Sequence, residues 1–378
     1  MHQPTIPHQT DHALMAMALE LARQGPEADP NPRVGCVLAT PDGEVVGRGW
    51  HRGAGTAHAE VVALQQAGAA ARGATAYVTL EPCDHTGRTG PCSHALVAAG
   101  ISRVVHAQHD PNPVAAGGAE RLRRAGLVVE GGLLADRAHA LNRTWTHLAR
   151  HGRPFVTWKF AATLDGRSAA ADGSSQWITG AALRARVGEL RSRCGAVVVG
   201  SGTLQRDDPR LTARDAAGEL LQHQPLRAVM GLAEVPGQAR VRGADGRFRH
   251  LATRDPQQAL TALAAEGVHH VWLEGGPRLA AAFWRAGLVD EVLACLAPVL
   301  LGAGTAAVAD LGIAGIEQAA RLRLERVEQV EQDLLLVLRP RADGDPAPPE
   351  APRDGTKHDE KTTDHTPGLP TGQRTKED

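Results

Sequence analysis

One short stretch of the chain, from His58 to Cys92, constrains its fold and chemistry more than any other. It reads His58-Ala59-Glu60, then an apolar run of helix length, then Glu81-Pro82-Cys83, and finally Gly90-Pro91-Cys92. One histidine and two cysteines supply three metal ligands. Three protein ligands leave the fourth tetrahedral position of zinc open for water, whereas structural zinc sites close the shell with a fourth Cys or His. Zinc lowers the pKa of bound water to about 7, and a nearby glutamate can move its protons.

The spacing of these residues is close to the H-x-E and P-C-x-x-C signature of zinc nucleobase deaminases. It departs from that signature at one place, because eight residues, Asp84 to Pro91, separate the two cysteines instead of two. A purely structural zinc site is the alternative, but it would leave Glu60 without a purpose and lack a fourth ligand. We therefore expect zinc on His58, Cys83 and Cys92, with Glu60 as the catalytic proton carrier.

Composition sets wider limits on the protein. Its 378 residues, 42% of them hydrophobic, suffice for two domains. A net charge of -1 gives no excess of basic residues that would favour binding to nucleic acid or to a membrane surface. Five scattered cysteines do not make a disulfide framework, and zinc thiolates require reducing conditions. Residues 1–11 lack an apolar signal core, and no run approaches the roughly 20 apolar residues of a membrane helix. We expect a cytoplasmic protein.

The first half of the chain alternates between strand and helix patterns. A helix is predicted from Asp11 to Gly25, a strand over 34–38, a turn over 41–43 and a second strand over 45–50. His58 and Glu60 open the next helix, and another helix begins at Ser93 after Cys92, so the metal should lie between two helix N-termini. Such alternation predicts a mainly parallel sheet covered by helices.

The second half repeats the alternation after an expected break near 147–154. Strands are predicted over 155–160, 196–199, 226–230, 270–273 and 291–296, with helices over 181–193 and 256–266. We therefore divide the chain into domains at 1–150 and 151–340. The remainder, 341–378, is rich in Pro, Asp, Thr and Lys, which predicts a disordered tail.

Several motifs in a fixed order support a family resemblance. The first half resembles the cytidine-deaminase-like fold, and the ordered chain resembles the bifunctional deaminase-reductases of riboflavin biosynthesis, whose long cysteine spacing it shares. The motifs are Pro30-Asn31-Pro32-Arg33-Val34-Gly35-Cys36, Gly55-Thr56-Ala57-His58-Ala59-Glu60, Thr79-Leu80-Glu81-Pro82-Cys83, Gly87-Arg88-Thr89-Gly90-Pro91-Cys92, Thr163-Leu164-Asp165-Gly166-Arg167, Ser175-Gln176-Trp177-Ile178-Thr179, Asp207-Asp208-Pro209 and Glu274-Gly275-Gly276-Pro277.

For the first half, the resemblance implies an α/β/α domain that uses zinc to hydrolyse an amino group. Its substrate would be 2,5-diamino-6-(5-phosphoribosylamino)pyrimidin-4-one, and Asn31 would contact the sugar or the ring. His85 and Arg88, in the inserted loop, have two interpretations. They are either solvated loop residues or partners of the substrate phosphate.

For the second half, the resemblance implies a dihydrofolate-reductase-like α/β domain. It would use NADPH to reduce the ribosyl group of 5-amino-6-(5-phosphoribosylamino)uracil to ribityl. The substrate positions carried over are Lys159, Ser175, Arg191, Leu211, Arg214 and Glu274. Those for NADPH are Ala161, Trp177, Thr203, Asp207, Gly276 and Pro277. A Gly-rich turn that enters a helix also offers N–H groups to phosphate, although a tight turn alone explains the same glycines.

The second half also departs from the family at Gly231 and Leu232. The family commonly has an aspartate followed by a small polar residue there, near the cofactor, and Gly231 and Leu232 cannot make the hydrogen bonds of those residues. The resemblance further implies small-molecule substrates and a homo-oligomer.

Two other functional classes stay open. A deaminase acting on tRNA or DNA predicts a basic face and stacking aromatics, whereas the charge is -1 and aromatics make up 3% of the chain. The second class is a non-catalytic binding protein that zinc stabilises and whose reductase half is degenerate. Ammonia release with and without a chelator separates this last class from an enzyme.

Overall fold

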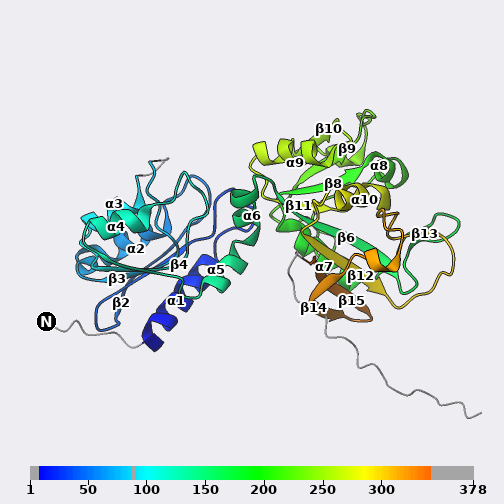
Figure 1. The fold of residues 1–378 in the computed structure, drawn as a ribbon. Coiled ribbons are helices and arrows are strands. Elements are labelled where there is room, and N and C mark those ends of the chain that lie inside the picture. The colour runs from blue at the N-terminus through cyan, green and yellow to red at the C-terminus, as the bar shows by residue number, and fades with distance from the viewer. Residues whose placement is uncertain (1–7, 87–89, 342–378) are drawn as a thin grey trace, which may run out of the picture. The chain divides into compact units, whose positions relative to one another are not determined.

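The computed structural model describes residues 8–86 and 90–341 (Figure 1). Arg88 and the expected tail beyond Arg341 lie outside the described residues. The described chain forms two separate large sheets, one in each half. Across these residues we find no helix that combines the length and the apolar character needed to cross a membrane.

The first sheet has five strands in the order β2-β1-β3-β4-β5. Their bounds are Gly35–Ala39 (β1), Val45–Trp50 (β2), Thr75–Leu80 (β3), Arg103–Gln108 (β4) and Val128–Gly131 (β5). β1 runs antiparallel to both β2 and β3, while β3, β4 and β5 are parallel. The prediction of a mainly parallel sheet therefore holds for β3, β4 and β5 and is wrong for β1, which is antiparallel to both of its neighbours. The turn predicted over 41–43 is present, with Gly43 N donating to Thr40 O, and it joins β1 to β2 as an antiparallel pair.

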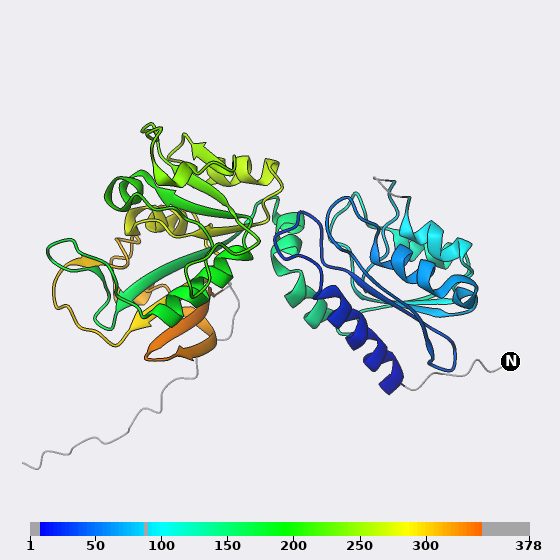
Figure 2. The ribbon, with the colours of Figure 1, turned by 180° about the vertical axis from the view of Figure 1, so that it is seen from behind.

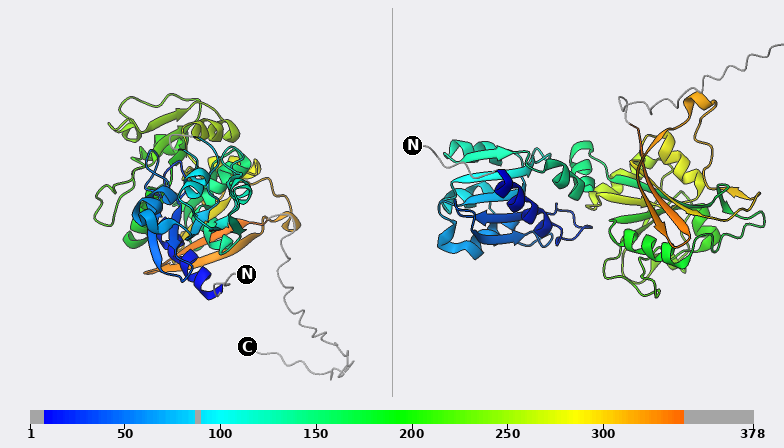
Figure 3. Two further views of the ribbon diagram at one scale, coloured as in Figure 1. Left: turned by 90° about the vertical axis from the view of Figure 1, so that its left-hand side faces the viewer. Right: turned by 90° about the horizontal axis from the view of Figure 1, so that it is seen from below.

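Helices cover both faces of this sheet. On one face lie α2 (Ala59–Ala67), α3 (Cys92–Ala98) and α4 (Gly118–Arg124), which pack on Cys36 and Leu38. On the other lie α1 (His8–Ala22) and α5 (Ala135–Leu141), which pack on Val37 and Ala39. Alternate residues of β1 thus serve opposite cores, as the two-residue period of a strand requires. Figures 2 and 3 show α1 lying across its face of the sheet.

The second sheet has eight strands in the order β10-β9-β8-β11-β6-β12-β15-β14. The bounds are Phe155–Thr163 (β6), Ala196–Gly200 (β8), Leu226–Met230 (β9), Phe248–Leu251 (β10), His270–Leu273 (β11), Glu291–Ala297 (β12), Leu322–Val330 (β14) and Asp333–Pro340 (β15). Strands from β10 to β12 are parallel, and β15 and β14 add an antiparallel edge. A small sheet pairs β7 (Arg167–Ala169) with β13 (Thr305–Ala306).

Two cores lie on opposite faces of the second sheet. One is formed with α9 (Pro256–Ala265) and α10 (Pro277–Arg285), and the other with α7 (Ala181–Ser192) and α8 (Ser201–Asp207). Helices on both faces of a largely parallel sheet are the arrangement expected of an α/β fold.

Helix α6 (Arg143–His151) lies between the two sheets and ends inside the stretch 147–154, where the sequence predicts a boundary. Gly152 follows the helix, and its φ of 66° is the left-handed conformation that glycine adopts at helix ends.

Candidate active sites

Three elements of the first half deliver the candidate zinc ligands. His58 is the N-cap of α2, Cys83 lies three residues beyond the end of β3, and Cys92 is the first residue of α3. The donor atoms of these three residues all lie within 4.8 Å of one another. His58 Nδ1 is 3.2 Å from Cys92 Sγ and 3.6 Å from Cys83 Sγ. Tetrahedral zinc holds nitrogen and sulfur ligands about 3.5 Å apart, so the donor set fits this ion.

The electrostatics of the site favour the thiolate form of Cys83. A hydrogen bond from the Cys92 thiol, followed by one from His58, lowers the pKa of Cys83 to about 4. Cys92 has its pKa raised in turn, because the two sulfur atoms share one proton. The peptide N–H of Cys92 also points at Cys83 Sγ, at 3.5 Å. A metal ion would replace the shared proton and keep both sulfurs as ligands.

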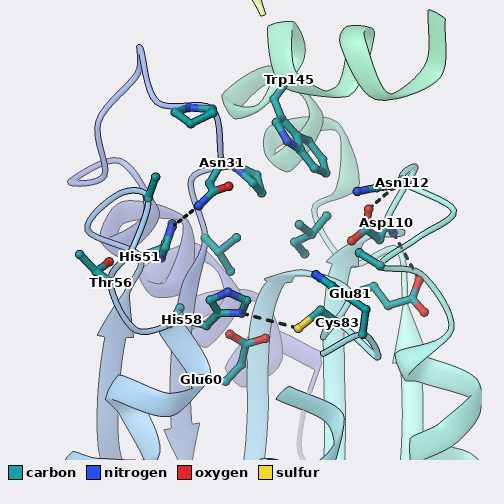
Figure 4. A pocket seen from close by; sticks show the side chains of 18 of the residues that line it. Asn31, His51, Thr56, His58, Glu60, Glu81, Cys83, Asp110, Asn112 and Trp145 are labelled. Atoms are coloured by element: carbon teal, nitrogen blue, oxygen red, sulfur yellow. Dashed lines mark hydrogen bonds between the residues drawn. The ribbon is translucent and has the colours of Figure 1, made fainter. Parts of the chain in front are cut away.

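Glu60 lies beside the ligands without being one of them. Its side chain is buried, and Figure 4 shows its carboxylate directed toward the space between His58 and Cys83. Burial raises the pKa of Glu60, and the neighbouring Cys83 raises it further. A carboxyl group in this setting can both accept and release a proton at the metal.

A cavity of about 450 Å³ opens above these residues (Figure 4). Asn31 lines it and donates its side-chain amide N–H to His51 Nε2 at 3.1 Å. Because this nitrogen accepts, His51 carries its proton on Nδ1, which lies 3.1 Å from Ala57 O. His51, which the sequence analysis did not select, thereby fixes the orientation of the Asn31 amide.

Three further lining residues escaped the sequence analysis, namely Asp110, Asn112 and Trp145. A signal for two of them was available, because Asp-Pro-Asn-Pro occurs twice, at 29–32 and at 110–113. Both copies form the same turn, in which the asparagine N–H donates to the aspartate Oδ1, at 2.9 Å for Asn31 and 2.8 Å for Asn112. The two turns present their asparagines to one cavity.

The inserted loop contributes one described residue to this cavity. His85 lines it, and His85 Nδ1 is buried without a hydrogen-bond partner among the residues that the structure describes. A buried imidazole nitrogen of this kind is suited to a ligand group. Nothing is shown for Arg88, which the structure does not describe.

In the second half, Glu274 gathers two cations predicted for the substrate. Lys159 Nζ lies 3.1 Å from Glu274 Oε1, and Arg191 Nη2 lies 2.5 Å from Glu274 Oε2. Trp272 Nε1 donates to the same Oε2 at 3.1 Å. Although burial opposes ionisation, the two cations, Arg191 first, hold the pKa of Glu274 down at about 2.

Arg214, another predicted substrate position, joins this cluster through Thr212. Arg191 Nη1 donates to Thr212 O and Arg214 Nε donates to Thr212 Oγ1, both at 3.0 Å. Leu211, beside them, is buried with a φ of 53°. The structure thus brings Lys159, Arg191 and Arg214 into one connected network around Glu274.

The cofactor positions fall into two groups. Thr203 Oγ1 accepts from Gly276 N at 3.0 Å, and Pro277 opens α10 directly afterwards. Ala161 lies on β6 two residues beyond Lys159, and Asp207 ends α8. By contrast, Trp177 lies on the segment between β7 and α7, which also carries Ser175, a position predicted for the substrate. There the exposed Trp177 ring stacks under Arg184, whose guanidinium carbon is 4.2 Å from the ring centroid.

Gly231, where the sequence departs from the family pattern, lies at a position with no room for a side chain. Its φ is 148°, and a Cβ placed on it would lie 2.1 Å from Ser201 Oγ. A side chain at this position therefore requires Ser201 to move. Leu232, the next residue, is exposed.

Comparison with family models divides the chain into two matches. The cytidine and deoxycytidylate deaminase zinc-binding region matches residues 8–108, and the RibD C-terminal domain matches residues 154–336. The α/β fold expected for each half is consistent with these matches.

Several proteins are similar to nearly the whole chain. The riboflavin biosynthesis protein RibD of Mycobacterium tuberculosis H37Rv is 49% identical over 310 residues, covering 82% of this chain and 91% of that protein. RibD of Escherichia coli K12 is 39% identical over 363 residues, with coverages of 87% and 99%.

Two solved structures are also similar to the chain over most of its length. Acinetobacter baumannii RibD superposes with a TM-score of 0.82 at 38% identity, covering 88% of this chain and 99% of that one. A diaminohydroxyphosphoribosylaminopyrimidine deaminase/5-amino-6-(5-phosphoribosylamino)uracil reductase from Thermotoga maritima has a TM-score of 0.78 at 31% identity, with the same coverages.

Proposed function

The chain belongs to the RibD family, the bifunctional deaminase-reductases of riboflavin biosynthesis, and we propose which of its residues carry each activity. The enzyme combines a zinc-dependent deaminase domain with a reductase domain that uses NADPH. The observation that carries the deaminase assignment is the meeting of three ligand atoms beside the buried Glu60.

In the deaminase domain, His58, Cys83 and Cys92 hold zinc. When bound, this ion activates a water molecule for attack on the ring carbon that bears the amino group. Glu60 would pass one proton of the attacking water to the ring nitrogen and the second to the departing amine, so that a C–O bond forms and becomes C=O, the C–N bond breaks and ammonia leaves. The substrate is 2,5-diamino-6-(5-phosphoribosylamino)pyrimidin-4-one, the class of molecule named for the Thermotoga maritima relative.

The other deaminase residues bind and orient this substrate. Asn31 hydrogen-bonds the ring or the sugar, supported by the orientation that His51 imposes on its amide. His85 and Arg88 bind the phosphate group, and the buried, unpaired Nδ1 of His85 supports this assignment.

In the reductase domain, the product of the first reaction is reduced from ribosyl to ribityl. Lys159, Ser175, Arg191, Leu211, Arg214 and Glu274 bind 5-amino-6-(5-phosphoribosylamino)uracil. Ala161, Trp177, Thr203, Asp207, Gly276 and Pro277 bind NADPH. The network around Glu274 supports the first group, and the backbone N–H groups at the start of α10 suit a cofactor phosphate.

We infer that the deaminase domain spans residues 1–150 and the reductase domain residues 151–340. The partners are small phosphorylated pyrimidines, with no nucleic acid or membrane among them. We place the protein in the cytoplasm as a homo-oligomer.

A single substitution tests the central assignment. Glu60→Gln keeps the size of the side chain but cannot carry the proton, so ammonia release should fall by about 10²-fold to 10⁴-fold with zinc content unchanged. NADPH oxidation with the deaminated product should stay at the wild-type rate. Glu44→Gln, an exposed residue near the β1–β2 turn, serves as the control. Retained deaminase turnover in Glu60→Gln would refute the role of Glu60.

A further inference from the structure

The residues that directly follow the two cysteine ligands bind each other. Asp84 follows Cys83 and Ser93 follows Cys92, and Ser93 Oγ donates to Asp84 Oδ1 at 2.6 Å. The Ser93 N–H also donates to the carbonyl oxygen of Cys83, at 3.2 Å. Ser93 is fully buried. The two ligand-bearing segments are therefore joined by contacts that involve no metal-binding atom.

A third residue and the main chain extend this connection to neighbouring elements. Arg121, on α4, places Nε 2.6 Å from the same oxygen, Asp84 Oδ1. The peptide N–H of Asp84 donates to Ala115 O at 3.0 Å, and Ala115 lines the cavity above the ligands. Asp84 thus ties the turn that carries Cys83 to α3, to α4 and to the cavity wall.

The long spacing between the cysteines explains why such a connection is useful. A chain that joins two ligands through eight residues rather than two brings them together less often, by roughly eightfold from loop-closure entropy. Contacts at the base of the loop remove this disadvantage, because they close the loop independently of the metal. They also set the position of the Cys92 N–H, which points at Cys83 Sγ.

We propose that Asp84, Ser93 and Arg121 form a clasp that positions the Cys83 and Cys92 sulfurs for zinc before the ion binds. These three are positioning residues, since none of them touches the metal site itself. The inference rests on the proposed zinc role of the two cysteines. It separates the role of Asp84, which orders the ligands, from that of His85, which lines the cavity.

The test measures zinc affinity on the full-length protein. Metal-free wild type and variants compete for zinc with a chromophoric chelator, which gives a dissociation constant without any assay of turnover. Ser93→Ala and Asp84→Ala both break the Ser93–Asp84 bond, and each should weaken zinc binding by about tenfold to a hundredfold. Asp84→Asn keeps an acceptor for Ser93 but loses the ion pair with Arg121, so its loss should be smaller.

A matched control comes from the same helix as Arg121. Glu120→Gln breaks the exposed pair between Glu120 and Arg124, whose Nε–Oε1 distance is 3.1 Å, and should leave zinc affinity unchanged. Saturating zinc should restore the deaminase kcat of Ser93→Ala to within about twofold of wild type, because a positioning residue acts through metal occupancy.

The outcomes distinguish the clasp from simpler explanations. Wild-type zinc affinity in both Ser93→Ala and Asp84→Ala would overturn the proposal, as would a loss of the same size in Glu120→Gln. A lower melting temperature of the metal-free variants with unchanged zinc affinity would assign Asp84 and Ser93 to stability alone. If the wild type itself fails to compete for zinc, the zinc assignment falls and the clasp falls with it.

Discussion

Lys159, on β6, and Glu274, the residue that follows β11, form an ion pair with Nζ 3.1 Å from Oε1 and both side chains less than a fifth exposed. Arg191 lies against the second carboxylate oxygen, so one carboxylate forms ion pairs with two cations. A buried charge left without its partner is strongly destabilising. The pair is therefore a structural element of the reductase domain as well as a proposed binding site.

Replacing the Glu274 carboxylate should show how far the stability of the reductase domain depends on it. Glu274→Gln leaves Lys159 and Arg191 without their anion and should destabilise the reductase domain by about 3 kcal/mol. Denaturant unfolding followed by tryptophan fluorescence measures the loss. Glu266→Gln, which breaks the more exposed pair with Arg249, should cost under about 1 kcal/mol. Equal losses in the two variants would contradict the argument.

The same domain should lose stability on the acid side. The pKa of Glu274 is lowered from 4.5 to about 2, so its stabilising effect is complete above pH 4.5 and is lost as the pH falls toward 2. Burial lowers the pKa of His270 from 6.5 to about 3, so its neutral form stabilises the fold above pH 6.5 and this contribution is lost as the pH falls toward 3.

Melting temperature measured against pH separates these two groups. His270→Gln, which keeps a polar side chain near Thr157 Oγ1, should flatten the decline between pH 6.5 and pH 3, so that the part caused by Glu274 remains below pH 4.5. His223→Gln, at an exposed position, is the control. If His270→Gln and the wild type have superimposable profiles, His270 is not the group responsible.

Glu81 should affect substrate binding without affecting zinc. Its carboxylate accepts from the N–H groups of Asp110, Gly117 and Ala119, at 3.3, 3.3 and 3.1 Å, and so holds the segment that carries Asp110 to the cavity. Glu81→Gln turns a donor toward these N–H groups and should raise the deaminase KM about tenfold, a change that corresponds to one lost buried hydrogen bond. Atomic absorption should show normal zinc. Loss of zinc instead would place Glu81 with the ligands.

Gly231 should tolerate a side chain only if Ser201 is shortened. Gly231→Ala combines a contact of 2.1 Å to Ser201 Oγ with a φ of 148°, and should cost about 1–3 kcal/mol. Adding Ser201→Gly should restore the part of the stability that Gly231→Ala loses through the contact with Ser201 Oγ. Gly237→Ala, where a Cβ meets nothing within 4 Å, is the control in thermal unfolding. Additive effects in the double variant would show that the contact does not matter.

The ligand set illustrates what the sequence alone could predict. The pattern of one histidine, two cysteines and a spare glutamate indicates zinc chemistry, and the helix signals beside His58 and Cys92 place helix N-termini at the site. The structure has both helices there. Such features are local, because each depends on residues close together along the chain.

Features that depend on distant partners were harder to predict. The edge strand β14 went unnoticed because most of its side chains are exposed and its register shifts between Leu324 and Arg326, which breaks the two-residue alternation. The link between Asp84, Ser93 and Arg121 joins three positions with no shared motif. The repeated Asp-Pro-Asn-Pro turns were visible in the sequence, but only the cavity shows that Asn31 and Asn112 serve the same space.

Those two turns have a consequence for an enzyme that has lost its metal. Each holds its shape through a hydrogen bond within four residues and through proline rings that restrict the backbone, so neither depends on zinc. The walls that receive the substrate should therefore persist while the chemistry is absent. Without zinc, the deaminase site should therefore be inactive but keep the shape that binds the substrate.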